Sequence, residues 1–583
     1  MTVVGTPGTA IGIGQGERGS EHSSWSPNPP WTRARVVLIG SMVLGAFLLV
    51  LAWREIGMGV FPLFGGLGKI FSFIGRTLPP QYTGYASFGH TVSVSLQTVS
   101  MAVLGTVIAA ALSVPVGFCA ARNTTPHPAV RWLARGVITA CRAVPDLVFA
   151  IVFVEALGIG VLPGVLALGV HSVGMLGKLF AEGIEQIEPR PREAVASTGA
   201  GPLQNLTTSV VPQVLPSFCS TSLYRLDINL RSSVVLGYVG AGGIGFALNA
   251  AMGALLFRQA VAIVLVIFVL IVVMEVVAAL VRRSLIGLES PVSRTARPRR
   301  NVGDRIVNRI IGPPARGERI GFDRERVRPP WTKERALRYG FLAGALVAVG
   351  LSLWDTSINP VTFVTSLGRI FHTIGHYFPP DFSTARSGLI HGTLQSASVA
   401  LVATTIGVAF AIPIGLLAAR NVSDRWVYRG ARLFLLVLRS VPELILAIVF
   451  VVAVGLGLVA GTFALIVGTV GFLSKLIADG IEEVPPLPRE AVLSVGATRS
   501  QETATSVVAP SAPALVANSF YMLDVNFRSS TILGIVGGGG IGYLLQQSVQ
   551  ILAYRTTGAI ILSTFVVVII IEVITSAIRK HLI

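Results

Sequence analysis

The chain has 583 residues, of which 52% are hydrophobic and only 13% are charged, and its formal net charge is +18. With a mean hydropathy of +0.72, it carries too little charge to cover the surface of a soluble protein of this length. The basic residues gather in segments expected on one side of a membrane, which is the positive-inside pattern and argues against a nucleic-acid-binding surface. We therefore expect an integral membrane protein.

The chain begins with a segment, residues 1–30, that is rich in Gly, Ser, Thr and Pro and is expected to be a disordered cytoplasmic tail. No short apolar region with a small-residue cleavage site precedes Val36, so the sequence predicts no signal peptide. Three cysteines, Cys119, Cys141 and Cys219, lie in or beside apolar segments without CxxC spacing. An odd count in this pattern favours packing residues over a disulfide framework or a metal site.

Comparison of the chain with itself shows one unit used twice. Asp227-Ile-Asn-Leu-Arg-Ser-Ser233 recurs as Asp524-Val-Asn-Phe-Arg-Ser-Ser530, and Arg142-Ala-Val-Pro-Asp146 recurs as Arg439-Ser-Val-Pro-Glu443. Matches of this kind run almost from end to end, which indicates a duplicated domain. The sequence predicts one domain at 31–283, an Arg-rich cytoplasmic linker at 284–330 and a second domain at 331–583.

Each copy contains about six apolar segments, so we expect an all-α membrane protein with about 12 transmembrane helices. The expected segments of the first copy are Val36–Trp53, Ser93–Ala121, Leu133–Ile159, Val161–Ile184, Leu215–Leu230 and Ala260–Val281. Those of the second copy are Ala336–Trp354, Thr393–Ala419, Leu433–Leu456, Val459–Ile481, Pro513–Phe527 and Ala559–Ile578. An even number of crossings puts both termini in the cytoplasm, and a pathway between two parallel copies is the natural consequence.

A polar loop follows the fourth segment of each copy, with prolines just before a Glu-Ala pair and a Gly-Ala pair after it. The prolines end the membrane helix and open a short amphipathic helix, which the glycine closes. An ordinary surface helix is the plain alternative, but the same spacing in both copies favours docking into a groove on a partner. The candidate docking residues are Glu193, Ala194, Gly199, Ala200, Glu490, Ala491, Gly496 and Ala497.

These Glu-Ala-x-x-x-x-Gly loops resemble the coupling motif of binding-protein-dependent ABC importer permeases. Three stretches of the first copy are further similar to phosphonate-importer permeases: Gly169–Glu182, Leu223–Arg231 and Leu236–Gly245. The resemblance covers about Pro29–Arg283 and, less closely, Pro329–Ile583. In the second copy Thr469 replaces His171, Ser474 replaces Gly177, and Gly538 replaces Ala241.

The resemblance implies the membrane-spanning permease of an importer for phosphonate, phosphite, phosphate or a related phosphorus oxyanion, with two permease units fused in one chain of the bacterial plasma membrane. It also implies a separate ATPase dimer on the cytoplasmic side, carrying ATP and Mg²⁺, and an extracytoplasmic binding protein. The sequence agrees with a separate ATPase, because it contains no GxxxxGK[ST] phosphate-binding loop. We expect no catalytic residue, metal or cofactor in this chain.

Two further patterns have plain explanations. Gly240–Gly245 and Gly537–Gly542 fit GxGxxG, but neither has the βαβ unit and acidic residue of a dinucleotide site, so we expect close helix packing or a turn. His171 is expected to be a packing histidine. Two sets of charged residues each share a helix face and are expected to form local ion pairs; they are Lys178, Glu182 and Glu185, and Lys475, Asp479 and Glu482.

The fifth segment of each copy supplies the candidate pathway residues, which are Asp227, Asn229, Arg231, Asp524, Asn526 and Arg528. Ionisable residues at such depth rarely face lipid, and a guanidinium has paired donors that match the oxygens of a phosphonate. Each arginine also follows an aspartate by four residues, which is the spacing of a structural ion pair on one helix. Both interpretations of the arginines stay open at the level of sequence.

Two other classes of function compete with an importer subunit. An ion-coupled secondary transporter of a small anion, built from parallel repeats, would need acidic relay residues deep in the bundle, whereas the acids here lie mostly at segment ends. It would also leave the two Glu-to-Gly loops unexplained. A membrane enzyme is disfavoured, because the sequence has no HExxH, GxSxG or paired-carboxylate constellation.

Overall fold

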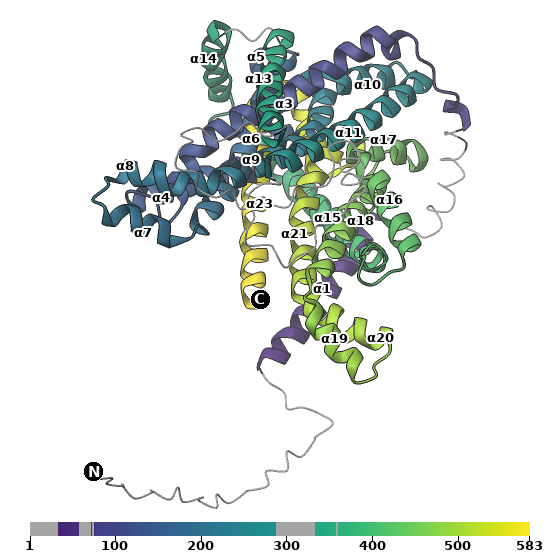
Figure 1. Ribbon diagram of the computed structural model, residues 1–583. Coiled ribbons are helices and arrows are strands. Elements are labelled where there is room, and N and C mark those ends of the chain that lie inside the picture. Colours follow the sequence, from purple (N-terminus) through teal and green to yellow (C-terminus); the bar gives the residue numbers. More distant parts are fainter. Residues whose placement is uncertain (1–32, 58–71, 73–74, 287–332, 357–359, 583) are drawn as a thin grey trace, which may run out of the picture. The chain divides into compact units, whose positions relative to one another are not determined.

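The structure is a computed structural model that describes residues 33–57, 72, 75–286, 333–356 and 360–582 (Figure 1). Within these ranges the chain forms helices, turns and loops and no β-strand, which confirms the all-α prediction. The expected tail and all but three residues of the expected linker lie outside the described ranges. Two compact units are distinguished, Met1–Val50 and Leu51–Ile583, so nearly the whole repeat belongs to the second unit.

The helices follow the same order in both copies. In the first copy they are α1 (Arg33–Ile56), α3 (Phe88–Ala120), α4 (Pro128–Ala143), α5 (Asp146–Leu157), α6 (Val161–Glu185), α7 (Pro189–Ser197), α8 (Pro202–Asn205), α9 (Val211–Leu236), α10 (Gly243–Gly253) and α11 (Phe257–Ile286). In the second copy they are α13 (Lys333–Thr356), α14 (Pro360–His376), α15 (Phe382–Leu417), α16 (Arg425–Ser440), α17 (Glu443–Val454), α18 (Leu458–Glu483), α19 (Pro486–Ser494), α20 (Arg499–Glu502), α21 (Ala509–Leu533), α22 (Gly540–Gln550) and α23 (Tyr554–Leu582). From α3 to α11 and from α15 to α23 the succession is the same.

By length and composition, seven stretches of helix in the described ranges are apolar enough to cross a bilayer, and three bent helix pairs raise the number to as many as ten. The seven are Phe88–Ala120, Val161–Glu185, Phe257–Ala278, Gly388–Leu417, Leu458–Glu483, Arg499–Gly538 and Tyr554–Ala577. The membrane character expected from the composition is therefore confirmed.

The third expected segment of each copy differs from the prediction, because it is broken in two. Helices α4 and α5 meet at 86°, and α16 and the apolar part of α17 meet at 79°. A proline follows the break in both copies, and the residue before it is extended, with φ −85° and ψ 124° at Val144 and φ −90° and ψ 117° at Val441. Proline disfavours helical geometry in the preceding residue, so a single straight helix cannot pass this point.

The longest helices of each copy approach one another closely at small residues. A Cβ atom on Gly105 of α3 would lie 2.8 Å from the Cβ of Leu168 on α6, and one on Gly415 of α15 would lie 2.9 Å from the Cβ of Ile477 on α18. Small residues that let backbones approach are the usual packing device of membrane helices. The α3–α6 and α15–α18 pairs therefore form the packed centre of each copy.

The glycine-rich segment after α9 forms a tight turn, as the sequence predicted. Gly240 has a φ of 105°, and Gly242 and Gly243 have φ of 77° and 71°, all in the left-handed region. The chain bends by 55° between the α9 region and α10. Gly245 then lies so close to α9 that a Cβ atom would be 1.9 Å from the carbonyl oxygen of Val234. The GxGxxG pattern thus serves backbone geometry and helix packing.

The two copies pack against each other through α5 and its neighbours. Leu147, Val148 and Ile151 of α5 lie in one buried cluster with Ile541 and Leu545 of α22. A second cluster joins Ala143 to Ala400, Phe527 and Val568 of the second copy. The broken third segment therefore contributes to the interface between copies, where the sequence predicts a pathway.

We predict that Gly245→Ala destabilises the membrane domain by at least about 1–3 kcal/mol, because the added methyl group overlaps a backbone carbonyl that cannot move independently of α9. The measurement is thermal unfolding of the purified protein in detergent. Gly136→Ala is the matched control, since nothing lies within 4 Å of a Cβ atom there. Equal stability of the two variants would contradict the close approach.

Candidate functional site

The two candidate docking loops have the same exposed geometry. Helices α7 and α19 each begin at prolines and end at a serine, and no side chain of α7 is buried. The glycines that follow have positive φ, 79° at Gly199 and 82° at Gly496, and their amides donate to the last turn at 3.1 and 3.0 Å. Glu193 and Glu490 are exposed. The expected short helix closed by glycine is present twice, with its acidic residue facing outward.

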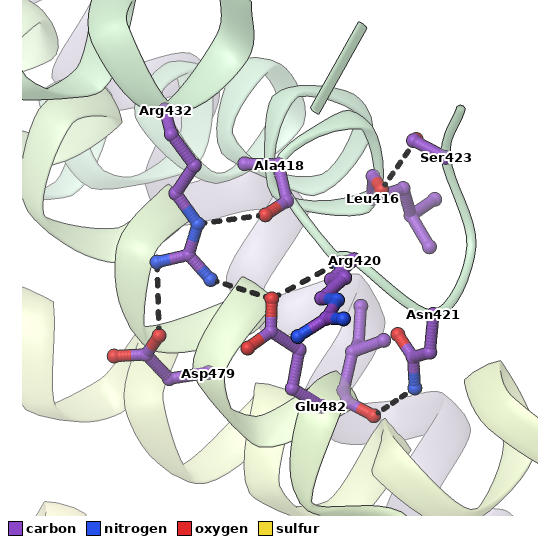
Figure 2. A network of polar contacts seen from close by, with 9 residues as sticks. Leu416, Ala418, Arg420, Asn421, Ser423, Arg432, Asp479 and Glu482 are labelled. Atoms are coloured by element: carbon purple, nitrogen blue, oxygen red, sulfur yellow. Dashed lines mark hydrogen bonds and ion pairs between the residues drawn. The ribbon is translucent and has the colours of Figure 1, made fainter. Parts of the chain in front are cut away.

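In the second copy, one arginine binds the end of α18 and the loop before α16 together (Figure 2). Arg432 of α16 pairs with Asp479 at 3.0 Å and with Glu482 at 2.8 Å, and its Nε donates to the carbonyl of Ala418 at 2.8 Å. Glu482 also accepts the backbone N–H of Arg420 at 2.9 Å. Each of these bonds has at least one charged side chain as donor or acceptor, so this corner of the copy is held by charge-assisted hydrogen bonds.

The docking helix α19 is fastened to this same corner. Arg489 of α19 donates to the carbonyl of Asn421 at 2.8 Å and forms an ion pair with Glu502 of α20. Asn421 in turn donates from its side chain to the carbonyl of Ile481, on α18, at 2.8 Å (Figure 2). Glu502 is only 3% exposed, so the pair is largely shielded from water. A movement of α19 is therefore passed to α18.

The first copy keeps the arginine corner, but among the described residues no hydrogen bond joins α7 to the loop after α3. Arg135 pairs with Glu185 at 2.9 Å and donates to the carbonyl of Ala120 at 3.1 Å. Asn205 stands where the second copy has Glu502, and its side chain donates to the carbonyl of Arg192 at 3.2 Å. A neutral hydrogen bond thus replaces the buried ion pair, so α7 is held less firmly than α19.

The local ion pairs expected at the ends of α6 and α18 are found only in part: within the described ranges Lys178 pairs with Glu182, whereas Lys475 has no ion pair within 4.0 Å. The Nζ of Lys178 lies 3.8 Å from Oε1 of Glu182, one helical turn further along α6. Glu185 instead pairs with Arg135 of α4, and Asp479 and Glu482 pair with Arg432 of α16. These pairs cross-link helices within a copy.

The candidate pathway arginines are both paired on their own helix. Arg231 binds Asp227 at 2.7 Å, and Arg528 binds Asp524, each across one helical turn. The four side chains are between 9% and 21% exposed. This is the geometry of the structural ion pair that the sequence left open. A pathway role for these residues stays a prediction.

The two candidate asparagines cross-link the packed helices of their own copies. Asn229 accepts from the hydroxyl of Ser172 on α6 at 3.0 Å and donates to that of Thr106 on α3 at 2.9 Å. Asn526 donates to the hydroxyls of Thr404 and Thr469 at 2.8 Å. Both asparagines are 0% exposed, so their polar atoms are bound inside the helix packing.

These contacts also correct the alignment of the copies. Thr469 bonds to Asn526 as Ser172 bonds to Asn229, so Thr469 is the counterpart of Ser172 rather than the replacement for His171. A shift of one residue is easily missed in a glycine-rich apolar helix. His171 itself donates from Nδ1 to the carbonyl of Val144 at 3.1 Å, which confirms a packing histidine with a satisfied ring.

Charged groups of both copies meet at their interface. Arg142 of α4 pairs with Glu572 of α23 at 2.9 Å, and Arg528 donates to the backbone carbonyl of Arg142 at 3.4 Å. Arg439, the counterpart of Arg142, lies in the electrostatic field of Arg231 and Glu275 of the first copy. Within the described ranges, the Nε groups of Arg142, Arg231 and Arg439 are buried without a hydrogen-bond acceptor. In this described part of the chain, these charged residues thus leave three N–H donors without a protein acceptor and one carboxylate oxygen, Oδ1 of Asp227, without a donor.

The sequence analysis missed Arg225 of α9, which is buried at 4% exposure. It lies in the Leu223–Arg231 stretch, but it does not recur in the repeat, because Met522 occupies the equivalent position of the second copy. A difference in charge between equivalent positions of the two copies is the feature of the sequence that could have pointed to Arg225.

We predict that the buried ion pair makes α19 more resistant to local opening than α7. Removal of one partner of a buried ion pair costs about 3–5 kcal/mol, so Glu502→Asn, which copies the first repeat, should speed amide hydrogen exchange in α19 by at least about tenfold. Hydrogen–deuterium exchange with mass spectrometry provides the measurement. Glu490→Gln, a change of an exposed residue on the same helix, is the control, and equal exchange of both variants would refute the attachment.

Comparison with known proteins assigns the chain to a family. The model of the family described as "Binding-protein-dependent transport system inner membrane component" matches residues 113–287 and 411–583. The phosphate-import permease protein PhnE of Mycolicibacterium smegmatis is 47% identical over 525 residues, which are 89% of this chain and 90% of that protein. The phosphite transport system permease protein PtxC of Stutzerimonas stutzeri is 42% identical over 243 residues, 42% of this chain and 87% of that protein.

The two family matches include both docking loops and both fifth segments, and together they cover more than half of the chain. The first relative spans both copies, whereas 87% of the second fits within 42% of this chain. This is what a fusion of two permease units predicts. The chain therefore belongs to the family of binding-protein-dependent transport system inner membrane components, with the family domain present twice.

Proposed function

We propose that this chain is the membrane-spanning permease of an ATP-driven importer that moves phosphonate or a related phosphorus oxyanion into the cell. The observation that carries the proposal is the pair of exposed Glu-Ala-x-x-x-x-Gly loops, each closed by a left-handed glycine, of which the second is fastened to the end of a buried helix. The class of substrate is supported by relatives named for phosphate and phosphite.

In this proposal, α7 and α19 dock onto a separate ATPase dimer, one helix for each ATPase subunit. The ATPase carries ATP and Mg²⁺, and an extracytoplasmic binding protein delivers the anion to the opposite side. Both termini and the linker lie in the cytoplasm with the docking helices, in agreement with the clustering of basic residues. The chain itself then supplies the path and the coupling, and no catalytic residue or cofactor.

The interface between copies is suited to an anion because three of its buried N–H donors have no protein acceptor among the described residues. Buried guanidinium groups of Arg142, Arg231 and Arg439 each keep one donor without a protein acceptor. Conduction requires binding that is weak enough for release. The aspartates and glutamates paired with these and neighbouring arginines reduce the net positive charge, so an anion would be attracted without being held tightly.

We predict that uptake of a phosphorus oxyanion by this chain in proteoliposomes requires ATP, the ATPase dimer and the loaded binding protein. Phosphate, phosphite and a phosphonate are each tested as radiolabelled substrates, with and without ATP. An importer gives no uptake in the absence of ATP. Uptake driven by a proton or sodium gradient without the ATPase would instead support an ion-coupled secondary transporter and defeat the proposal.

We also predict that Gly199→Pro combined with Gly496→Pro abolishes ATPase binding and uptake. Proline requires a φ near −65°, and these glycines have φ of 79° and 82°, so both loops must change shape. The folded membrane domain should persist, because nothing lies within 4 Å of either glycine's Cβ position. Co-purification with the ATPase provides the measurement.

The matched control for the loop variant is Ser197→Ala with Ser494→Ala, which changes the same two loops without altering backbone geometry. Each serine hydroxyl donates only to a carbonyl of its own helix at 2.8 Å. This control should retain ATPase binding. Undiminished binding by the double proline variant would rule out the two loops as the docking contacts.

A further inference from the structure

Arg225 is a buried cation whose charged end has no protein partner among the described residues. Its Nε donates to the hydroxyl of Ser172 at 2.8 Å, and the two Nη groups make no hydrogen bond and no ion pair within 4.0 Å. The residue is only 4% exposed. An unpaired charge among membrane helices is strongly unfavourable, so the Nη groups are left to a partner that is not part of this chain, either water or a ligand.

The second copy shows that the helix packing does not need this arginine. Its threonine–asparagine network, Thr404 with Asn526 and Thr469, has the same form as the network of Thr106, Asn229 and Ser172. Yet the position equivalent to Arg225 holds Met522, which is 1% exposed. The arginine therefore adds a charge to a framework that is complete without it.

The polar and charged groups that act on Arg225 come from both copies. The groups that act on it electrostatically are Asp146 at the start of α5, Tyr224 beside it, and Tyr521 and Arg528 of α21 in the second copy. Asp146 accepts the amide of Leu147 at 2.9 Å, and Arg528 is paired with Asp524. That amide carries no net charge, so Asp146 still acts on Arg225, although from beyond ion-pair distance, whereas Arg528 is neutralised by its own aspartate. Among the described residues neither Arg225 nor Arg439 has an ion pair within 4.0 Å, and of the two only Arg225 has no arginine at the equivalent position of the other copy.

We propose that Arg225 binds the transported oxyanion between the copies. Only the first of the two copies would then supply this arginine to the anion site. This inference rests on the proposed function. With Nε held by Ser172, the guanidinium fork directs two Nη groups toward one ligand, which suits two oxygens of a tetrahedral phosphorus oxyanion. Arg231 and Arg528 do not play this part, because each is bound to an aspartate of its own helix.

The test is uptake by the full chain assembled with its ATPase and binding protein, using the oxyanion that the wild type transports best. Arg225→Met, which copies the second repeat, should reduce uptake at low substrate concentration by about ten- to a hundredfold, the loss expected for hydrogen bonds to a charged group. ATPase activity stimulated by the loaded binding protein should persist. Met522→Leu, the matched change in the other copy, should leave uptake unchanged.

A double variant separates anion binding from simple neutralisation of Asp146. If Arg225 only balanced that carboxylate, Arg225→Met combined with Asp146→Asn would restore uptake, and this result would overturn the proposal. If Arg225 binds the anion, the double variant stays defective. Arg225→Met combined with Met522→Arg moves the cation to the equivalent position of the second copy and should recover part of the uptake.

Arg225→Gln covers the case in which the methionine variant fails to assemble, because glutamine can still donate to Ser172 and lacks only the charge. It should assemble with the ATPase and lose uptake to a similar extent. Wild-type uptake by this variant would overturn the anion site and leave the proposed function intact. Absence of ATP-dependent oxyanion uptake by the wild type would defeat the proposed function itself.

Discussion

A charge inside a bundle of apolar helices needs a partner, and this requirement governs where the polar residues of the chain lie. Arg432 binds Asp479 and Glu482, Arg142 binds Glu572, and Arg231 and Arg528 bind aspartates of their own helices. The pairs of Arg432 and Arg142 join separate helices, and those of Arg231 and Arg528 lie within one helix; breaking any of them leaves a buried charge behind. The pairs therefore fix the ends of helices within a copy and the contact between copies, and an unpaired cation such as Arg225 stands out against them.

Because the domain is duplicated, equivalent positions of the two copies can be compared within one chain. Two copies of one framework retain the polar network at Asn229 and Asn526 and the docking loops, while the positions of Arg225 and Met522 and of Asn205 and Glu502 have diverged. In a transporter assembled from two identical units, both halves would have to bear the same residues. Fusion in one chain removes that constraint, so one copy can supply a charge at the interface while the other fastens its docking helix more firmly.

Much of the fold could be predicted from hydropathy and self-comparison, because the repeat and the long apolar segments are local properties of the sequence. The break within Leu133–Ile159 was missed, although Pro145 marked it, since an apolar count does not register a change of direction. Contacts between residues far apart in the chain, such as that of Arg142 with Glu572, could not be predicted, because no spacing encodes them. The two short exposed helices closed by glycine could be predicted from their repeated motif, and their docking role stays a prediction. Arg225 could not be predicted in this way, because it has no counterpart.

The docking loops and the interface between copies are connected by one short helix in each half. Helix α16 holds Arg432, which is bound to the end of α18, and seven residues later holds Arg439, which faces charges of the first copy. Seven residues of helix span about 10 Å.

The break at Val441-Pro442 follows immediately after α16, and Ile445 of α17 packs in a buried cluster of the first copy. Because α19 is fastened to the α18 end through Arg489 and Asn421, a displacement of α19 acts on α16 at one end and reaches the charged interface at the other. Helix α4 links the end of α6 to the interface in the first copy through Arg135 and Arg142, but within the described residues α7 has no bond like that of Arg489 with Asn421, so the two halves transmit such a displacement unequally.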